Sequence, residues 1–261
     1  MTSGRSLRAA IGVAAVAGLA LPRDASADTI HVLCSNGFKA VMETLAPQFE
    51  QATNHKVVVV YSVAAELKRR IDGGEAFDLA ILTPAAIDDL IARRTVIAET
   101  RSVLARSAMA IAIRAGTPRA DISTTEAFTR ALSQAKSIAY AREGATGVFF
   151  AETVQRLGLA DMVARKARLA ATGDEVGAAI VRGDAELGVL PVSEILAVPG
   201  LEVLGRFPRD VEGYVTMVAG VSAAGARMPA VQDLVRFLTA PEQRPVLERK
   251  GMESQAGRQG R

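Results

Sequence analysis

The chain is poor in the residues on which most catalytic and metal sites depend. Its 261 residues include one cysteine, two histidines and no tryptophan, and aromatic residues make up 4%. A single cysteine allows no disulfide within the chain, and Cys34 follows an apolar segment, so we expect a buried thiol. His31 and His55 have no partner at a metal-ligand spacing. We therefore expect no metal site and no cofactor.

Apolar runs long enough to cross a bilayer, which takes ~20 residues, are also absent. The segment Ala9–Leu21 follows Arg5 and Arg8 and precedes the small residues Ala25-Ser26-Ala27. This order is typical of a secretory signal peptide. We expect residues 1–27 to be removed and the mature protein to be periplasmic.

A large excess of charge of one sign is missing as well. Removing residues 1–27 takes away three arginines and one aspartate, which lowers the formal net charge from +3 to +1. Lysine and arginine are interspersed with acidic residues along the predicted helices, as in the segment Glu66–Arg70. This pattern is typical of solvated helix faces, so we expect no nucleic-acid partner.

The segment 56–91 shows a clear pattern, in which the order strand, turn and helix occurs twice in succession. Val57–Tyr61 and Leu79–Leu82 are apolar runs of strand length, and we expect both to be buried on both faces. Ser62 and Thr83 follow them and are expected to cap the next helices. The pattern predicts an α/β protein with a parallel sheet covered by helices.

Two later segments predict that the chain crosses between two lobes. The apolar run after Arg101 is about twice the usual strand length, and a second apolar segment leads back near Gly213–Val221. We assign residues 28–108 and 217–261 to lobe 1 and residues 109–216 to lobe 2. Three capping boxes are predicted to open helices, at Ser123–Glu126, Thr172–Glu175 and Thr239–Glu242.

Donor-rich turns follow several of the predicted strands. In such sheets ligands bind beyond the carboxyl ends of the strands, where helix N-termini present unpaired N–H groups. The turns favour a small anion held by neutral donors, although each turn alone is also explained as a helix cap. They are Ser35–Gly37, Ser62–Ala65, Thr83, Gly144–Gly147 and Thr172–Val176.

From Thr29 to about Met252 the chain resembles the extracellular solute-binding proteins of ABC importers, in particular the periplasmic molybdate-binding proteins. The resemblance implies a two-lobed periplasmic-binding-protein fold of type II, with a ligand cleft between the lobes and two crossover strands. It also implies a monomer without enzymatic activity that delivers a small anion to a membrane permease. The sequence segments that carry the resemblance are Ala46–Phe49, Leu67–Gly73, Phe77–Leu79, Gly147–Leu157 and Ala185–Glu194.

The resemblance also implies positions for the ligand donors. Backbone N–H donors of lobe 2 fall near Thr146 and Val176, and hydroxyl positions fall near Gly37 and Ala64. A tyrosine position falls near Pro191. Because apolar residues replace hydroxyls at some of these positions, the cleft favours an organic anion with a hydrocarbon body.

We therefore predict a set of ligand-binding residues and no catalytic residue. Arg142 is a candidate for a bidentate contact with a carboxylate, with a solvated strand-end arginine as the alternative, and Ser107 is a candidate at the crossover. The set is Ser35, Asn36, Gly37, Ser62, Ala64, Thr83, Ser107, Arg142, Thr146, Val176 and Pro191.

Two other function classes stay open. A secreted hydrolase would use Ser222 or Cys34 as its nucleophile, although Gly220-Val-Ser222 lacks the final glycine of a nucleophile elbow and no histidine follows it. A sensor module would present its liganded state to a receptor instead of a transporter. The ligand is open between a molybdate-like oxyanion and a small organic carboxylate.

Overall fold

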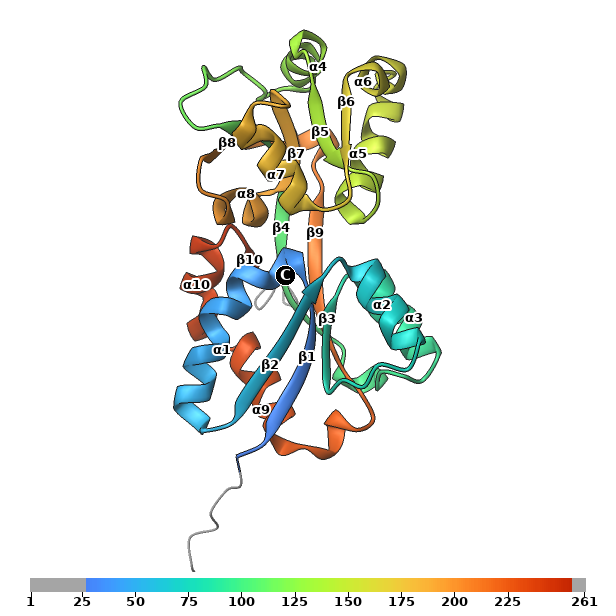
Figure 1. The fold of residues 1–261 in the computed structure, drawn as a ribbon, viewed down its shortest axis with the longest axis vertical. Helices are drawn as coiled ribbons and strands as arrows, with labels where there is room; N and C mark the ends of the chain where they lie inside the picture. The colour runs from blue at the N-terminus through green and yellow to red at the C-terminus, as the bar shows by residue number, and fades with distance from the viewer. Residues whose placement is uncertain (1–26, 255–261) are drawn as a thin grey trace, which may run out of the picture.

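Two strands pass between two α/β lobes in the computed structural model (Figure 1). β4 (Ser102–Arg114) leads out of the lower lobe of that view and β9 (Tyr214–Val221) leads back. The structure describes residues 27–254, so the predicted signal peptide lies outside the described residues except for Ala27. The α/β class and the two crossover strands predicted from the sequence are confirmed. Within residues 27–254, no helix has the length and apolar character needed to span a membrane.

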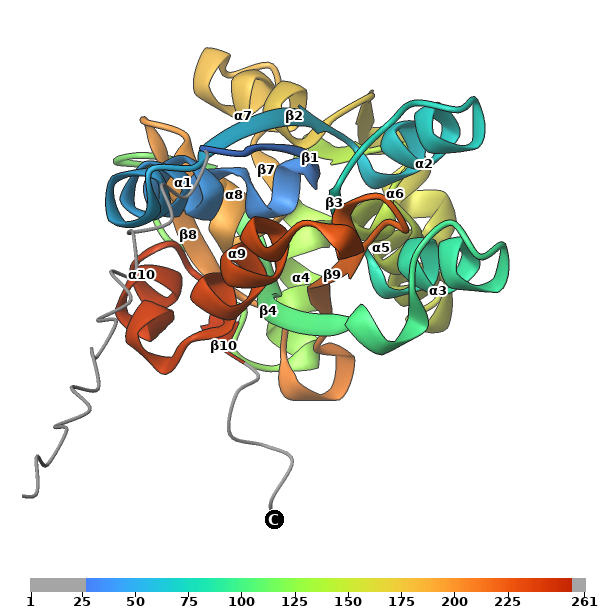
Figure 2. The ribbon, with the colours of Figure 1, turned by 90° about the horizontal axis from the view of Figure 1, so that it is seen from below.

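The lower lobe has a sheet in the order β2-β1-β3-β9-β4, with β10 paired to β4. Its first three strands are parallel, and β9 is antiparallel to β3 and β4. Helices cover both faces of this sheet, as the view from below shows (Figure 2). Its elements are β1 (Thr29–Ser35), η1 (Asn36–Phe38), α1 (Lys39–Thr53), β2 (Lys56–Ser62), α2 (Ala64–Asp72), β3 (Leu79–Leu82), α3 (Pro84–Ala92), η2 (Ala98–Thr100), η4 (Gly225–Arg227), α9 (Pro229–Thr239), η5 (Pro241–Gln243), α10 (Arg244–Arg249) and β10 (Glu253–Ser254).

The upper lobe repeats this plan on the second half of β4. From Met109 onward β4 pairs with β7 on one side and, from Ala110, with β8 on the other. β5 and β6 extend the sheet parallel to β7. The elements are α4 (Thr125–Gln134), β5 (Ile138–Ala141), α5 (Ala145–Arg156), α6 (Ala160–Lys166), β6 (Ala167–Ala170), α7 (Gly173–Arg182), β7 (Leu187–Pro191), α8 (Val192–Ala197), β8 (Leu201–Arg206) and η3 (Arg209–Val211).

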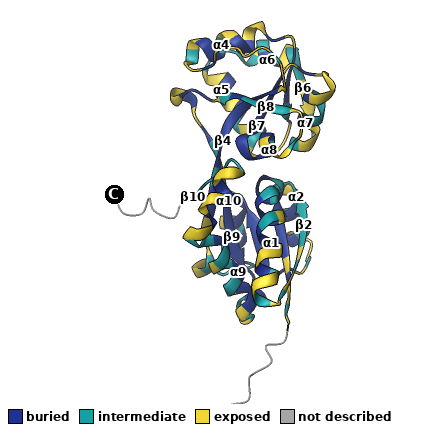
Figure 3. Ribbon diagram, turned by 90° about the vertical axis from the view of Figure 1, so that its left-hand side faces the viewer, coloured by how far each residue is buried: buried dark blue, intermediate teal, exposed yellow. Residues whose placement is uncertain are grey.

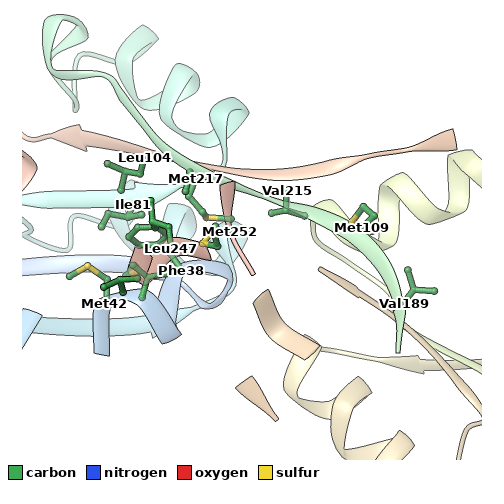
Figure 4. Close-up of a cluster of buried hydrophobic side chains, with 14 of the residues drawn as sticks. Phe38, Met42, Ile81, Leu104, Met109, Val189, Val215, Met217, Leu247 and Met252 are labelled. Carbon is green, nitrogen blue, oxygen red and sulfur yellow. The ribbon is translucent and has the colours of Figure 1, made fainter. Parts of the chain in front are cut away.

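The central strands are buried between partly exposed outer helices (Figure 3), and apolar side chains fill both of their faces. On β1 the side chains alternate: Val32 and Cys34 pack toward α1, while Leu33 packs toward α2 and α3. One cluster follows the crossover strands from Met217 in the lower lobe to Met109 in the upper lobe (Figure 4). The two lobes therefore share one continuous apolar core along β4 and β9.

Sequence periodicity predicted the long elements well and the short ones poorly. The bounds of β3 agree with the prediction, and β4, with 13 residues, is about twice the usual strand length as expected. The expectation that Val57–Tyr61 is buried on both faces is wrong, because β2 is the edge strand and Val58 is 47% exposed. The short elements α6, β6, α8 and β8 were not predicted.

The predicted helix caps had mixed outcomes. Thr172 caps α7 as expected: its hydroxyl accepts from the Glu175 N–H at 3.2 Å, and Glu175 accepts from the Ala171 N–H. Ser62 and Thr83 make no capping hydrogen bond, which corrects the prediction for α2 and α3. α4 is capped by Thr124, one residue later than predicted.

The third predicted capping box is wrong. The Thr239 hydroxyl donates back to the Val235 carbonyl within α9. Thr239 is the last residue of α9 and opens no helix, and a short 3-10 turn lies between α9 and α10.

Ser222 holds the end of β9 against the loop that precedes β3. Its buried hydroxyl donates to the Phe77 carbonyl at 2.7 Å and accepts from the Gly225 N–H at 3.0 Å. The first bond joins segments that are distant in the sequence, and the second closes the local turn that follows β9. The hydroxyl therefore has a structural role, and this explains its burial without any nucleophilic function.

Replacing Ser222 by Ala should destabilise the fold. Removing the hydroxyl leaves a buried carbonyl and a buried N–H without this partner, which costs about 1–3 kcal/mol. Urea unfolding followed by circular dichroism measures the loss. Ser133→Ala, which removes an exposed hydroxyl on α4, serves as the control and should change stability by less than about 0.5 kcal/mol. An S222A protein as stable as this control would contradict the structural role.

Candidate functional site

A cavity lies between the lobes, at the carboxyl ends of β1, β3, β5 and β7. The volume that the centres of water molecules can occupy in it is about 70 Å³. Because one water needs ~10–15 Å³ by this measure, the cavity holds about five to seven waters, or a small solute of similar size. We call it the cleft cavity. Its lining residues are Ser35, Asn36, Gly37, Val63, Ala64, Thr83, Ala141, Glu143, Gly144, Ala145, Thr146, Thr172, Gly173, Leu190, Glu194, Val215 and Met217.

The lower wall is formed by strand ends and the helices that follow them. Ser35 ends β1, and Ala64 begins α2. Thr83 lies between β3 and α3. These residues converge because β1, β2 and β3 are parallel and in register, so their carboxyl ends reach one edge of the sheet. The hydroxyls of Ser35 and Thr83 make no hydrogen bond with any residue in the described range 27–254.

The upper wall is formed by the turns before α5 and α7. Gly144 has φ of 97°, a conformation that favours glycine, and its carbonyl accepts the first helical bond of α5, from Val148. The N–H groups of Ala145 and Thr146 precede that bond and have no partner within the helix. At α7 the N-cap is Thr172, and Gly173 is the first residue of the helix.

Glu194 is the acidic side chain that reaches the cavity from α8. A Cβ added to Gly173 would lie 1.9 Å from its Oε2, and one added to Gly37 would lie 3.8 Å from its Oε1. The carboxyl therefore lies between an upper-lobe turn and a lower-lobe turn. It makes no hydrogen bond or ion pair with the residues that the structure describes.

The surroundings of Glu194 favour its protonated form. Burial raises the pKa of its carboxyl to about 7, and the negative charge of Asp174 adds to the rise. Neither lysine nor arginine is among the lining residues of the cleft cavity. At neutral pH this carboxyl can therefore both accept and donate a proton.

Six of the eleven predicted ligand-binding residues line the cleft cavity. They come from both lobes, and their role in binding stays a prediction. They are Ser35, Asn36, Gly37, Ala64, Thr83 and Thr146.

Of the other five predicted residues, two make hydrogen bonds within the fold with the polar groups that were expected to contact the ligand. Ser107 is fully buried, and its hydroxyl donates to the Gly251 carbonyl at 2.9 Å and accepts from the Ser193 N–H at 3.0 Å. The Val176 N–H donates to the Thr172 carbonyl at 3.2 Å. Val176 itself does not line the cavity, whereas Gly173, three residues earlier, does.

The last three predicted residues do not line the cavity, because their places in the fold keep their side chains away from it. Ser62 is paired with Ser35 in the strand register but does not reach the lining. Arg142 is exposed and points to a separate surface hollow beside Leu169. Pro191 is buried at the end of β7, and its predecessor Leu190 lines the cavity instead.

The most important residue that the sequence did not reveal is Glu194. It belongs to a helix of six residues, too short to give a periodic signal, and it is one of many acidic residues in the chain. Met217 was missed for a similar reason, since an apolar residue on a strand carries no sign that it faces a cavity.

The two nucleophiles of the hydrolase alternative do not line the cavity. Ser222 is bound to backbone groups at the opposite end of β9 from the crossover. Cys34 is fully buried in the lower core, and burial raises the pKa of its thiol. Among residues 27–254, histidine, cysteine and acidic side chains form no group that could hold a metal ion.

Replacing Glu194 by Gln should change how stability depends on pH. The folded protein keeps this proton up to about pH 7, whereas an unfolded glutamate releases it near 4.5. The contribution of Glu194 to the free energy of unfolding is therefore full below about pH 4.5 and is lost as the pH rises through about 7. The loss amounts to at most about 3 kcal/mol, and E194Q should remove it.

Urea unfolding from about pH 5 to about pH 8 measures this difference. Glu152→Gln makes the same change at an exposed position on α5 and should keep the pH dependence of the wild type. If E194Q also kept it, Glu194 would not hold a proton in the folded state.

Comparison with known proteins places this geometry in a family. The family model for bacterial extracellular solute-binding proteins matches residues 30–253. An aconitate isomerase from Pseudomonas sp. is 30% identical over 251 residues, covering 94% of this chain and 95% of the relative. The molybdate-binding protein of Escherichia coli K12 is 26% identical over 247 residues, covering 91% and 92%.

Solved structures share the fold. The periplasmic molybdate-binding protein of Azotobacter vinelandii superposes with a TM-score of 0.73 at 16% identity, covering 86% of this chain and 98% of that one. The sulfate-binding protein of Mycobacterium tuberculosis H37Rv gives 0.69 at 14% identity, covering 88% of each. With its family match over nearly all described residues, the chain belongs to the bacterial extracellular solute-binding proteins.

Proposed function

We propose that the chain is a periplasmic binding protein for a small organic carboxylate, which it holds in the cleft cavity. The observation that carries the proposal is a set of unpaired donors converging on the cavity from both lobes. These are the hydroxyls of Ser35 and Thr83 and the N–H groups that begin α2 and α5. Such donors bind an anion without a full countercharge.

Glu194 favours an organic acid over a molybdate-like dianion. A single negative charge about 4 Å from an ionised carboxylate is repelled by ~1 kcal/mol in water and by ~4 kcal/mol at an effective dielectric constant of 20. A dianion at the same distance is repelled by twice as much. A carboxylate ligand can avoid this cost by accepting a hydrogen bond from the protonated Glu194. The side chains of Leu190, Val215 and Met217 provide contacts for a hydrocarbon body.

In this proposal the ligand leaves the cleft at the membrane permease of an ABC importer. The lobes would close on the ligand by bending β4 and β9, and the closed form would be what the permease recognises. A receptor that reads the same closed form would make the chain a sensor instead. The lobe division at residues 108/109 and 216/217 belongs to this proposal, as does a monomeric state.

A second candidate function is the isomerisation of an unsaturated carboxylate. The specific observation that favours it is Glu194, an unpaired carboxyl in the cavity with a pKa near neutrality. The similarity to an aconitate isomerase over 94% of the chain supports it, and aconitate is an unsaturated tricarboxylate. Both candidates need the same ligand class and the same cavity.

Calorimetric titration of the purified protein tests the shared ligand class. After bound ligand has been removed by unfolding and refolding, we expect binding of aconitate or another di- or tricarboxylate and no heat with molybdate. Binding of molybdate alone would overturn the assignment to organic acids.

Thr83→Val should weaken carboxylate binding by about tenfold. Valine keeps the shape of threonine but cannot donate a hydrogen bond to an anion, and such a bond is worth about 1.5 kcal/mol. Thr129→Val on α4, outside the cavity, is the matched control and should bind as the wild type does. Equal affinities of T83V and wild type would remove the Thr83 hydroxyl from the site.

A further inference from the structure

The position of Glu194 is unusual for an acidic residue in a protein that binds anions. It lies in the first turn of α8, directly after β7, and its carboxyl lies against Gly173 and Gly37. An alanine at position 173 would collide with its Oε2 at 1.9 Å. The close approach leaves the carboxyl facing the cavity.

The charged groups around Glu194 are mostly acidic. Asp174 of α7 faces it from the upper lobe, and Glu143, before α5, lines the same cavity. On the other side of Gly37, Lys39 and Glu43 of α1 line an adjoining hollow that Glu194 also touches. Lys39 lies 5.8 Å above the ring of Tyr61 and makes no ion pair with Glu194. The carboxyl therefore has no countercharge that would fix it as a carboxylate.

From this geometry we propose that Glu194 is the catalytic residue of an allylic proton shift on an unsaturated carboxylate bound in the cleft cavity. The inference rests on the carboxylate-binding function proposed above. It assigns the substrate class, an alkene carboxylic acid with an acidic C–H next to the double bond, and the group that moves the proton.

The step is balanced without any metal, cofactor or oxidant. The Glu194 carboxylate removes a proton from the carbon next to the double bond, so that a C–H bond breaks and an O–H bond forms. The electron pair spreads over the double bond and the conjugated carboxylate. The protonated Glu194 then returns the proton to the far end of the allyl system, and the double bond shifts. The carboxyl ends each cycle in its starting form.

The remaining groups of the cavity suit this chemistry. Negative charge develops on a carboxylate oxygen of the substrate, and the free N–H groups at the start of α2 and α5 are placed to stabilise it. A substrate that fills the small cavity displaces the water it holds, which protects the carbanion from protonation by solvent. A carboxyl with a pKa raised to about 7 by burial and by Asp174 serves as both base and acid at neutral pH.

The test follows cis- and trans-aconitate in D2O by proton NMR, with binding measured by calorimetry on the same samples. We expect the wild type to interconvert the isomers. E194Q should bind aconitate within about threefold of wild type but turn it over at least ~100-fold more slowly. E194D, which retains the acid but moves it back by one methylene, should recover part of the rate. E152Q should be unchanged.

The pH profile gives an independent readout. The rate of the wild type should rise as Glu194 loses its proton, with a midpoint near pH 7. Because Asp174 raises the pKa of Glu194, Asp174→Asn should move that midpoint to lower pH. A change of rate without a shift of the midpoint would contradict this coupling.

The outcomes separate the two proposals. Binding of aconitate by the wild type without turnover would overturn the catalytic role and leave the binding function standing. Turnover by E194Q at the wild-type rate would overturn the assignment of Glu194. Absence of binding to aconitate and to all other carboxylates would overturn the binding function and the catalytic role together.

Discussion

The structure depends on the two antiparallel strands that belong to both lobes. β4 pairs with β9 up to Ala108 and with β7 from Met109, so one continuous hydrogen-bonded ladder carries the chain from one sheet into the other. Strand ends of both lobes therefore face a common space. The apolar core runs along the same strands, which makes the relative position of the lobes a property of packing rather than of a flexible linker.

The contacts beside this ladder limit how the lobes can move. Ser107 joins α8 to the end of α10, because its hydroxyl bonds to Ser193 and Gly251 at once. Nearby, desolvation opposes ionisation of Glu253, but hydrogen bonds from Arg106 and Arg206 keep the pKa of its carboxyl below the ordinary value. These contacts lie at the crossover itself and tie α8 and the C-terminal segment to β4.

The sequence predicted what depends on local pattern and missed what depends on the meeting of distant segments. The burial of β3 and the length of β4 follow from their composition, and the turns at Ser35, Thr83 and Thr146 follow from the rule for parallel strand ends. The sequence did not predict which residue at the start of α7 lines the cavity. Val176 was predicted, but its N–H donates within the helix, and Gly173 lines the cavity instead. Glu194 was out of reach because only the packing of α8 against Gly37 and Gly173 brings it to the cavity.

Under the proposed reaction, one carboxyl separates an enzyme from a binding protein on this scaffold. Neutral donors at helix N-termini bind an anion equally well whether or not it reacts, so they lower the energy of the ground state and of the transition state together. A group that exchanges a proton with the ligand adds stabilisation that exists only along the reaction path. In the proposed reaction Glu194 is such a group, and its desolvated carboxyl without a partner costs stability as the pH rises. A residue that only binds a carboxylate needs to keep its proton as a hydrogen-bond donor, whereas a residue that transfers a proton must also release it, which a pKa near 7 permits.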